Sequence, residues 1–182
     1  MSGDPYLDTT WREFERLKGI AERAMAQLDD QKYVSTLGPE DNSIAIMVKH
    51  MAGNMLSRWR DFLTSDGEKP DRNRDGEFEF GEYNSRDQLN TMWEQGWVCL
   101  FGSLEPLKES DLGRTITIRG EPHTVLQAIS RQLSHYAYHV GQIVFVAKHL
   151  SGDQWKTLSV PKGQSETFNK TPDSYLESTG SE

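Results

Sequence analysis

The chain has 182 residues and a formal net charge of −8, and its length suits one domain with a single hydrophobic core. An acidic surface repels phosphate backbones and anionic lipid headgroups, which argues against nucleic acid and membranes as partners. No apolar run is long enough to span a membrane, and the first residues lack the basic and apolar regions of a signal peptide. Because Cys99 is the one cysteine and cannot form an internal disulfide, we expect a cytoplasmic protein.

The first two predicted helices are recognised by apolar residues at three- and four-residue steps, which form one helix face. The first helix covers about residues 7–28, with a stripe of Leu7, Trp11, Phe14, Leu17, Ala21, Ala24 and Leu28. The second begins near Asn42, a suitable N-cap, and should end near Ser65. Its stripe consists of Ile44, Met47, Met51, Met55, Trp59 and Phe62.

The third and fourth predicted helices follow a long polar segment. The third begins after Ser85 and ends near Pro106, because proline stops or kinks a helix. The fourth starts near Glu121-Pro122, where proline suits a first turn, and runs to about Leu150. It is apolar over a wide arc, so we expect it to be the most buried helix. Between the two, alternation at residues 115–118 predicts one strand of a small hairpin.

The connections between these helices are unequal in length. The first, at residues 29–41, is short, whereas the second, at residues 65–85, is long and charged. A long connection permits a crossover, so successive helices need not alternate in direction. The pattern predicts an all-α fold, a four-helix bundle with a long crossover loop between its second and third helices. One domain would occupy residues 1–170, and residues 171–182 would form a polar, flexible tail.

Two histidines on the fourth predicted helix form a candidate metal site. His135 and His139 are four residues apart, which places both imidazoles on one face in the spacing of a helical zinc-binding pair. The candidate third ligand is His50, in the middle of the second helix. Gly53 lies close to it and costs roughly 1 kcal/mol in a helix interior. This cost indicates the close approach of another element or of a ligand near His50.

Three neutral imidazoles from two helices would leave coordination positions open, as in a catalytic metal site. Four polar residues lie near the same faces and are candidates for hydrogen bonds to the ligands. They are Asn54, Gln132, Tyr138 and Gln142. In the alternative interpretation, His135 and His139 are hydrogen-bonded polar residues at the edge of a core and His50 is a solvated surface residue.

The second connection also matches the loop of an EF-hand calcium site. The oxygen ligands would be Asp71, Asn73, Asp75 and Glu82, with Gly76 at the sharp turn. Pro70, directly before the loop, disfavours the entering helix. Arg72 and Arg74 would place two cations beside the ion. The alternative is a solvated loop whose acidic and basic side chains pair with one another.

Two segments together resemble the DinB/YfiT-like superfamily of metal-binding four-helix bundles. They are His50-Met-Ala-Gly-Asn54 and, far downstream, His135-Tyr-Ala-Tyr-His139-Val-Gly-Gln142. The similarity is strongest to a branch of uncharacterised bacterial proteins, which residues 72–78 and 155–169 also resemble. It extends over most of the chain, from the first helix to Asn169.

This resemblance implies a bundle with up-down-down-up topology, a homodimer, and a divalent metal on His50, His135 and His139. The metal is usually zinc or nickel, and iron or manganese would also suit three imidazoles. The resemblance further implies a metal-dependent enzyme related to bacillithiol transferases. Such an enzyme would transfer a low-molecular-weight thiol to a small-molecule substrate or activate water. The alternative is a non-catalytic, stress-linked dimer that binds metal or a small molecule.

Overall fold

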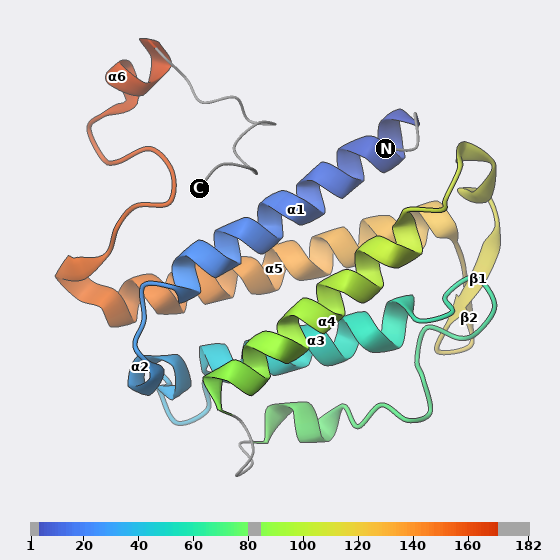
Figure 1. Ribbon diagram of the computed structural model, residues 1–182, viewed down its shortest axis with the longest axis horizontal. Coiled ribbons are helices and arrows are strands. Elements are labelled where there is room, and N and C mark those ends of the chain that lie inside the picture. The colour runs from blue at the N-terminus through green and yellow to red at the C-terminus, as the bar shows by residue number, and fades with distance from the viewer. Residues whose placement is uncertain (1–3, 80–84, 171–182) are drawn as a thin grey trace.

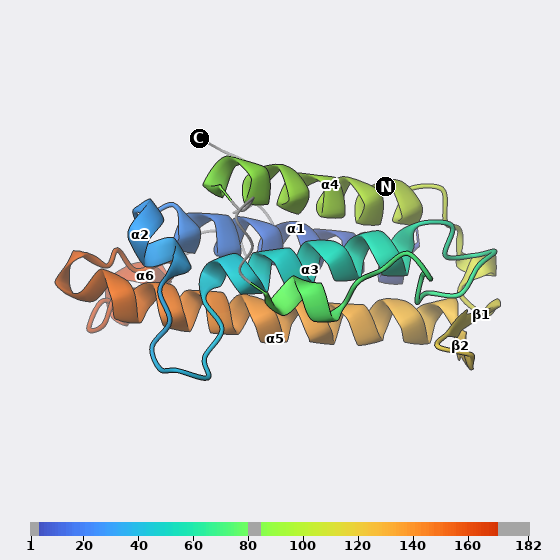
Figure 2. The ribbon, with the colours of Figure 1, turned by 90° about the horizontal axis from the view of Figure 1, so that it is seen from below.

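The computed structural model describes residues 4–79 and 85–170, which are mostly helical. Four of the described helices are long: α1 (Pro5–Met25), α3 (Ile44–Trp59), α4 (Arg86–Leu104) and α5 (Val125–Ser151). Figure 1 shows them side by side, with α1 and α5 running in one direction and α3 and α4 in the other. Figure 2 shows α4 and α5 on opposite sides of the molecule, with α1 and α3 between them. The main packing contacts join α1 to α5 and α3 to α4.

Shorter elements connect and follow these helices. They are α2 (Asp30–Val34), η1 (Asp75–Phe78), η2 (Glu109–Asp111), β1 (Thr115–Ile118), β2 (Glu121–Thr124), η3 (Gly152–Gln154) and α6 (Ser165–Lys170). The sequence pattern does not predict α2 or α6, because helices of about one turn are too short to show a 3.6-residue period. Among the described residues, no helix combines the length and apolar character needed to cross a bilayer. The predicted tail at residues 171–182 lies outside the described residues.

The predicted start of the fourth helix is wrong. Glu121 and Pro122 belong to β2, which pairs antiparallel with β1, and α5 begins at Val125. Thr124 caps the helix, because its hydroxyl accepts a hydrogen bond from the amide of Gln127 at 3.1 Å. Proline fits both a first helical turn and a strand without a neighbour on one side, so its presence alone does not decide between them. The predicted strand at residues 115–118 is confirmed as β1.

The other long helices begin close to their predicted positions. The predicted start of the third helix is confirmed, because the Ser85 side chain caps α4. The second helix is capped by Ser43 rather than by Asn42, and it ends at Trp59, earlier than predicted. In both helices the capping hydroxyl accepts a backbone hydrogen bond that the first helical turn would otherwise leave unmade.

An aromatic cluster joins the four long helices at one level. Phe14, Trp59, Trp97 and Tyr136 come from α1, α3, α4 and α5 respectively, and each is at most 1% exposed. Their ring centroids lie 5.9 to 6.4 Å apart in four of the pairings, which is the range of favourable aromatic contacts. The Tyr136 hydroxyl donates to Asn54 Oδ1 at 3.1 Å and accepts from Trp59 Nε1 at 3.0 Å. These contacts set the rotation of α5 relative to α3.

The segment between α3 and α4 has to return along the molecule, because these two helices run in the same direction (Figure 1). It first passes the hairpin, where the Gly67 amide donates to the carbonyl of Thr117 at 2.8 Å. The Ser57 hydroxyl of α3 then donates to the Gly67 carbonyl and accepts from the amide of Lys69. Finally, η1 packs on the side of α3. The return therefore places the residues of η1 against the middle of α3.

Candidate metal centre

The structure brings His50 of α3 together with His135 and His139 of α5. One ring nitrogen from each residue lies within 4.8 Å of the other two, and the ring centroids are 4.7 to 5.6 Å apart. His50 is buried and the other two are half-buried. Within residues 4–79 and 85–170, this is the one group of at least three His, Cys, Asp or Glu side chains that converges closely enough to hold an ion.

The two histidines of α5 already have a spacing suited to one ion. His135 Nε2 and His139 Nε2 are 3.1 Å apart, and two nitrogens that each bind zinc at about 2.0–2.1 Å lie roughly 3 Å apart. The other ring nitrogen of His139, Nδ1, lies 2.8 Å from Gln142 Oε1. With the proton on Nδ1, this hydrogen bond leaves the Nε2 lone pair available for a metal.

A carboxylate orients His50 in the same way. Glu77 Oε2 lies 2.9 Å from His50 Nδ1, so Nδ1–H donates to the carboxylate and Nε2 is left as the ligand atom. Arg72 holds Glu77 in place through two hydrogen bonds, Nε to Oε1 at 2.8 Å and Nη2 to Oε2 at 2.9 Å. Burial raises the pKa of Glu77, but the hydrogen bonds from His50 and Arg72 outweigh burial and lower it overall. The carboxylate is therefore negatively charged at neutral pH.

Gly53 explains how Glu77 reaches His50. It lies three residues after His50 in α3, and a Cβ at this position would be 2.3 Å from Glu77 Oε1. The close approach that the sequence predicts near His50 is thus the approach of Glu77. The sequence interpretation missed Glu77 itself, because it considered the segment at residues 71–82 only as a calcium loop or as a solvated, self-paired loop. The glycine one turn from a candidate ligand was the signal that could have pointed to it.

Burial also controls the charge of the α5 histidines. It lowers the pKa of His135 to about 3, with further lowering from the positive charges that His139, His50, Arg58 and Arg72 can carry. Burial lowers the pKa of His139 as well, with a contribution from His50, while the hydrogen bond to Gln142 acts in the opposite direction. Both rings are therefore neutral at pH 7, which is the form of histidine that binds a metal.

The four predicted hydrogen-bonding residues occupy different surroundings. Gln142 contacts His139 directly. Asn54 and Gln132 are buried and line a cavity beside His50 and His135. Tyr138 is 63% exposed and lines a separate cavity between α5 and the segment before α3, although its ring contacts that of His139 at a centroid distance of 5.2 Å.

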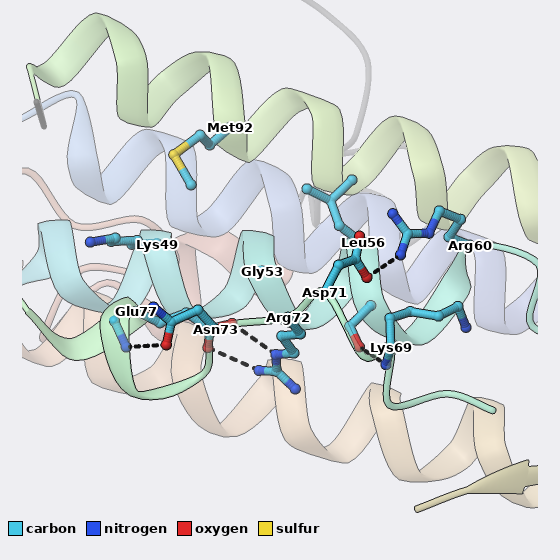
Figure 3. A pocket seen from close by; sticks show the side chains of 12 residues that line it. Lys49, Gly53, Leu56, Arg60, Lys69, Asp71, Arg72, Asn73, Glu77 and Met92 are labelled. Carbon is cyan, nitrogen blue, oxygen red and sulfur yellow. Dashed lines mark hydrogen bonds and ion pairs between the residues drawn. The ribbon is translucent and has the colours of Figure 1, made fainter.

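The residues of the predicted calcium loop have other contacts in this structure. Figure 3 shows the Asp71 carboxylate directed at Arg60, whose Nη2 donates to Oδ1 at 2.6 Å. The Asn73 side chain accepts a hydrogen bond from the loop's own backbone, and the Asp75 side chain is 96% exposed. Glu82, the predicted bidentate ligand, lies outside the described residues. Calcium binding would require the first three side chains to turn toward one another, and it stays a prediction.

Fold and site together define a mostly helical protein with a three-histidine cluster between two of its long helices. The chain belongs to the DUF1572 family, which is described as proteins of unknown function and whose model matches residues 1–164. That match includes all four long helices and all three histidines. No curated protein and no solved structure matches the chain.

Proposed function

We propose that this protein is a DinB-like four-helix bundle that holds one divalent transition metal on His50, His135 and His139 and acts as a metal-dependent enzyme. The observation that carries the proposal is the convergence of three ring nitrogens within 4.8 Å. Two of the rings are oriented through their opposite nitrogens by Glu77 and Gln142. The opposed directions of α1 and α5 against α3 and α4 also agree with the up-down-down-up order of the DinB/YfiT-like superfamily (Figure 1).

The donor set fits a divalent transition metal. Three neutral imidazoles suit zinc and nickel best, and iron or manganese less closely. A metal held there would have open coordination positions and would acidify a bound thiol or water. The proposed reaction is therefore transfer of a low-molecular-weight thiol to a small electrophile, or hydrolysis of such a molecule.

The residues around the histidines have separate tasks in this proposal. Glu77 keeps the His50 ring in its tautomer and orientation, and Arg72 keeps Glu77 in place. The Asn54 side chain is fixed by the Tyr136 hydroxyl. Gln132 Oε1 is buried without a hydrogen-bond partner among the described residues, so it can accept an O–H or N–H of a bound molecule.

We also propose a cytoplasmic homodimer that uses no nucleic acid and no membrane. Tyr138 and Phe145 are 63% and 66% exposed and lie seven residues apart on α5, which puts them on one face. They line a cavity of about 460 Å³ between α5 and the segment before α3. Exposed aromatic residues that share a face are typical of an interface with another copy of the chain.

Elemental analysis of the purified, untagged protein tests the proposal first. We expect about one equivalent of a transition metal per chain in the parent and little in the His139→Ala variant. The matched control is His149→Ala, which removes an exposed histidine from the last turn of the same helix and should keep the metal. No metal in the parent, even after incubation with zinc and nickel, would refute the site. Bound metal without turnover of any thiol or hydrolytic substrate would favour the non-catalytic alternative.

A further inference from the structure

A cavity rich in arginine lies beside the three histidines. It has a volume of about 210 Å³ and is lined by His50, His135, two buried amide side chains and five arginines. The arginines are Arg58, Arg72, Arg74, Arg119 and Arg131. This concentration of positive charge stands out in a chain whose formal net charge is −8.

Carboxylates near the cavity do not neutralise it. Glu68 lies 3.1 to 3.4 Å from three of the arginines, and Glu77 is bound by Arg72 (Figure 3). Asp75 lies 4.0 Å from Arg74. Within the described residues, three carboxylates are thus ion-paired with the five guanidinium groups, and Glu77 is also shared with His50. A fourth carboxylate, Asp66, is bound to the amides of the hairpin turn. The cavity keeps a positive potential, which low-dielectric walls strengthen.

Arg58 is a buried cation in this cavity with unsatisfied hydrogen-bond donors. It is 6% exposed, and its Nε and Nη1 atoms have no hydrogen-bond partner among the described residues. Its remaining nitrogen, Nη2, makes a long contact of 3.4 Å with Glu68. Buried guanidinium nitrogens without hydrogen-bond partners are unfavourable, and such nitrogens in a cavity point to a ligand that completes their hydrogen bonds.

Two exposed arginines stand at the edge of the same cavity. Arg131, in the second turn of α5, contacts His123 through Nη1 at 3.0 Å. Arg119 is held at a φ of 56° in the hairpin turn, because the Asp66 carboxylate accepts hydrogen bonds from the amides of Arg119 and Gly120, each at 2.8 Å. The hairpin is thereby fixed with the guanidinium of Arg119 at the cavity.

We propose that this arginine cavity binds an anionic group, a carboxylate or a phosphate, of a small molecule. Guanidinium groups match the planar and tetrahedral oxygens of both anions. Because His50 and His135 line the same space, a molecule anchored here would extend its other end toward the histidine cluster. The anion site requires no metal. Its use in positioning a substrate rests on the proposed metal-dependent function.

Calorimetric titration of the metal-free, full-length protein with inorganic phosphate and with succinate tests the proposal. Ionic strength is matched with sodium chloride, so that general screening does not contribute. We expect at least one of the two anions to bind, and the one that binds more tightly identifies the ligand group as a phosphate or a carboxylate. Arg119→Gln and Arg131→Gln should each weaken binding about tenfold or more, since each removes a charged hydrogen-bond donor. Both residues are exposed, so the variants should fold, which their melting curves will check.

The control is Arg23→Gln, which removes the same charge from the last turn of α1, at the end of the molecule away from the hairpin (Figure 1). It should bind the anion as the parent does. Absence of binding at millimolar concentrations of both anions, or equal weakening by Arg23→Gln, would overturn the proposal. The His139→Ala variant separates the two proposals, because it should lose the metal and keep the anion. If the parent protein binds an anion but takes up no metal, the anion cavity is supported and the metal site is refuted.

Discussion

Replacing Gly53 with alanine tests whether Glu77 is held against His50 as described. The new Cβ would lie 2.3 Å from Glu77 Oε1 and 2.8 Å from its Cδ, so the carboxylate must move. Alanine in a helix should gain about 1 kcal/mol over glycine, whereas overpacking costs about 1–3 kcal/mol and a lost charged hydrogen bond about 1.5–3 kcal/mol. We expect Gly53→Ala to lower the free energy of unfolding by about 2–5 kcal/mol and to weaken zinc binding about 10- to 100-fold.

Two controls isolate the contact with Glu77. Gly141→Ala in α5 is the matched substitution, because a Cβ there meets nothing within 4 Å, and it should stabilise by up to about 1 kcal/mol. In a Glu77→Ala background the obstacle is gone, so Gly53→Ala should change from destabilising to stabilising. Urea denaturation gives the free energies, and competition with a chromophoric chelator gives the zinc affinity. A Gly53→Ala protein that is stabilised like Gly141→Ala and binds zinc normally would refute this reasoning.

Three further predictions concern the surroundings of the histidines. Tyr136→Phe should lower the free energy of unfolding by about 1–3 kcal/mol, because Asn54 and Trp59 lose their buried partner; an unchanged urea midpoint would contradict this. Burial lowers the pKa of His135 from 6.5 to about 3 in the folded protein. Between these two pH values, His135 is therefore protonated in the unfolded chain but not in the folded one. Stability of the metal-free protein should therefore fall as pH drops from 7.5 to 5, less so in His135→Gln. Finally, a chelator should lower the melting temperature of the metal-loaded parent but not of His139→Ala.

Local pattern was sufficient for most of the helical framework. The apolar stripes predicted α1, α3, α4 and α5, because burial of one helix face imposes a period of 3.6 residues on the sequence. Local pattern failed at Glu121-Pro122, where the same residues suit a helix start or a strand. These residues form a strand because they pair with β1. That pairing is a contact between two segments and is not encoded in the local sequence of either segment.

The same distinction applies to the site. Helix geometry alone puts His135 and His139 on one face, so their spacing in the sequence was enough to predict the pair. Gly53 likewise indicated a close approach to α3. Neither the histidine pair nor Gly53 identifies which segment approaches α3 or which cations lie beside the histidines.

Only the tertiary structure decided those two features. Glu77 contacts His50 across 27 residues of sequence, and Arg58 and Arg131 line the same cavity from α3 and α5. The Glu77 contact depends on the parallel course of α3 and α4, which forces the connecting segment back along α3, and the arginine pair depends on the packing of α3 against α5. The sequence of that segment carries the spacing of a calcium loop, whereas its packing turns Glu77 inward onto a histidine. A contact of this kind is set by the path of the chain through space, and no local periodicity in the sequence reports it.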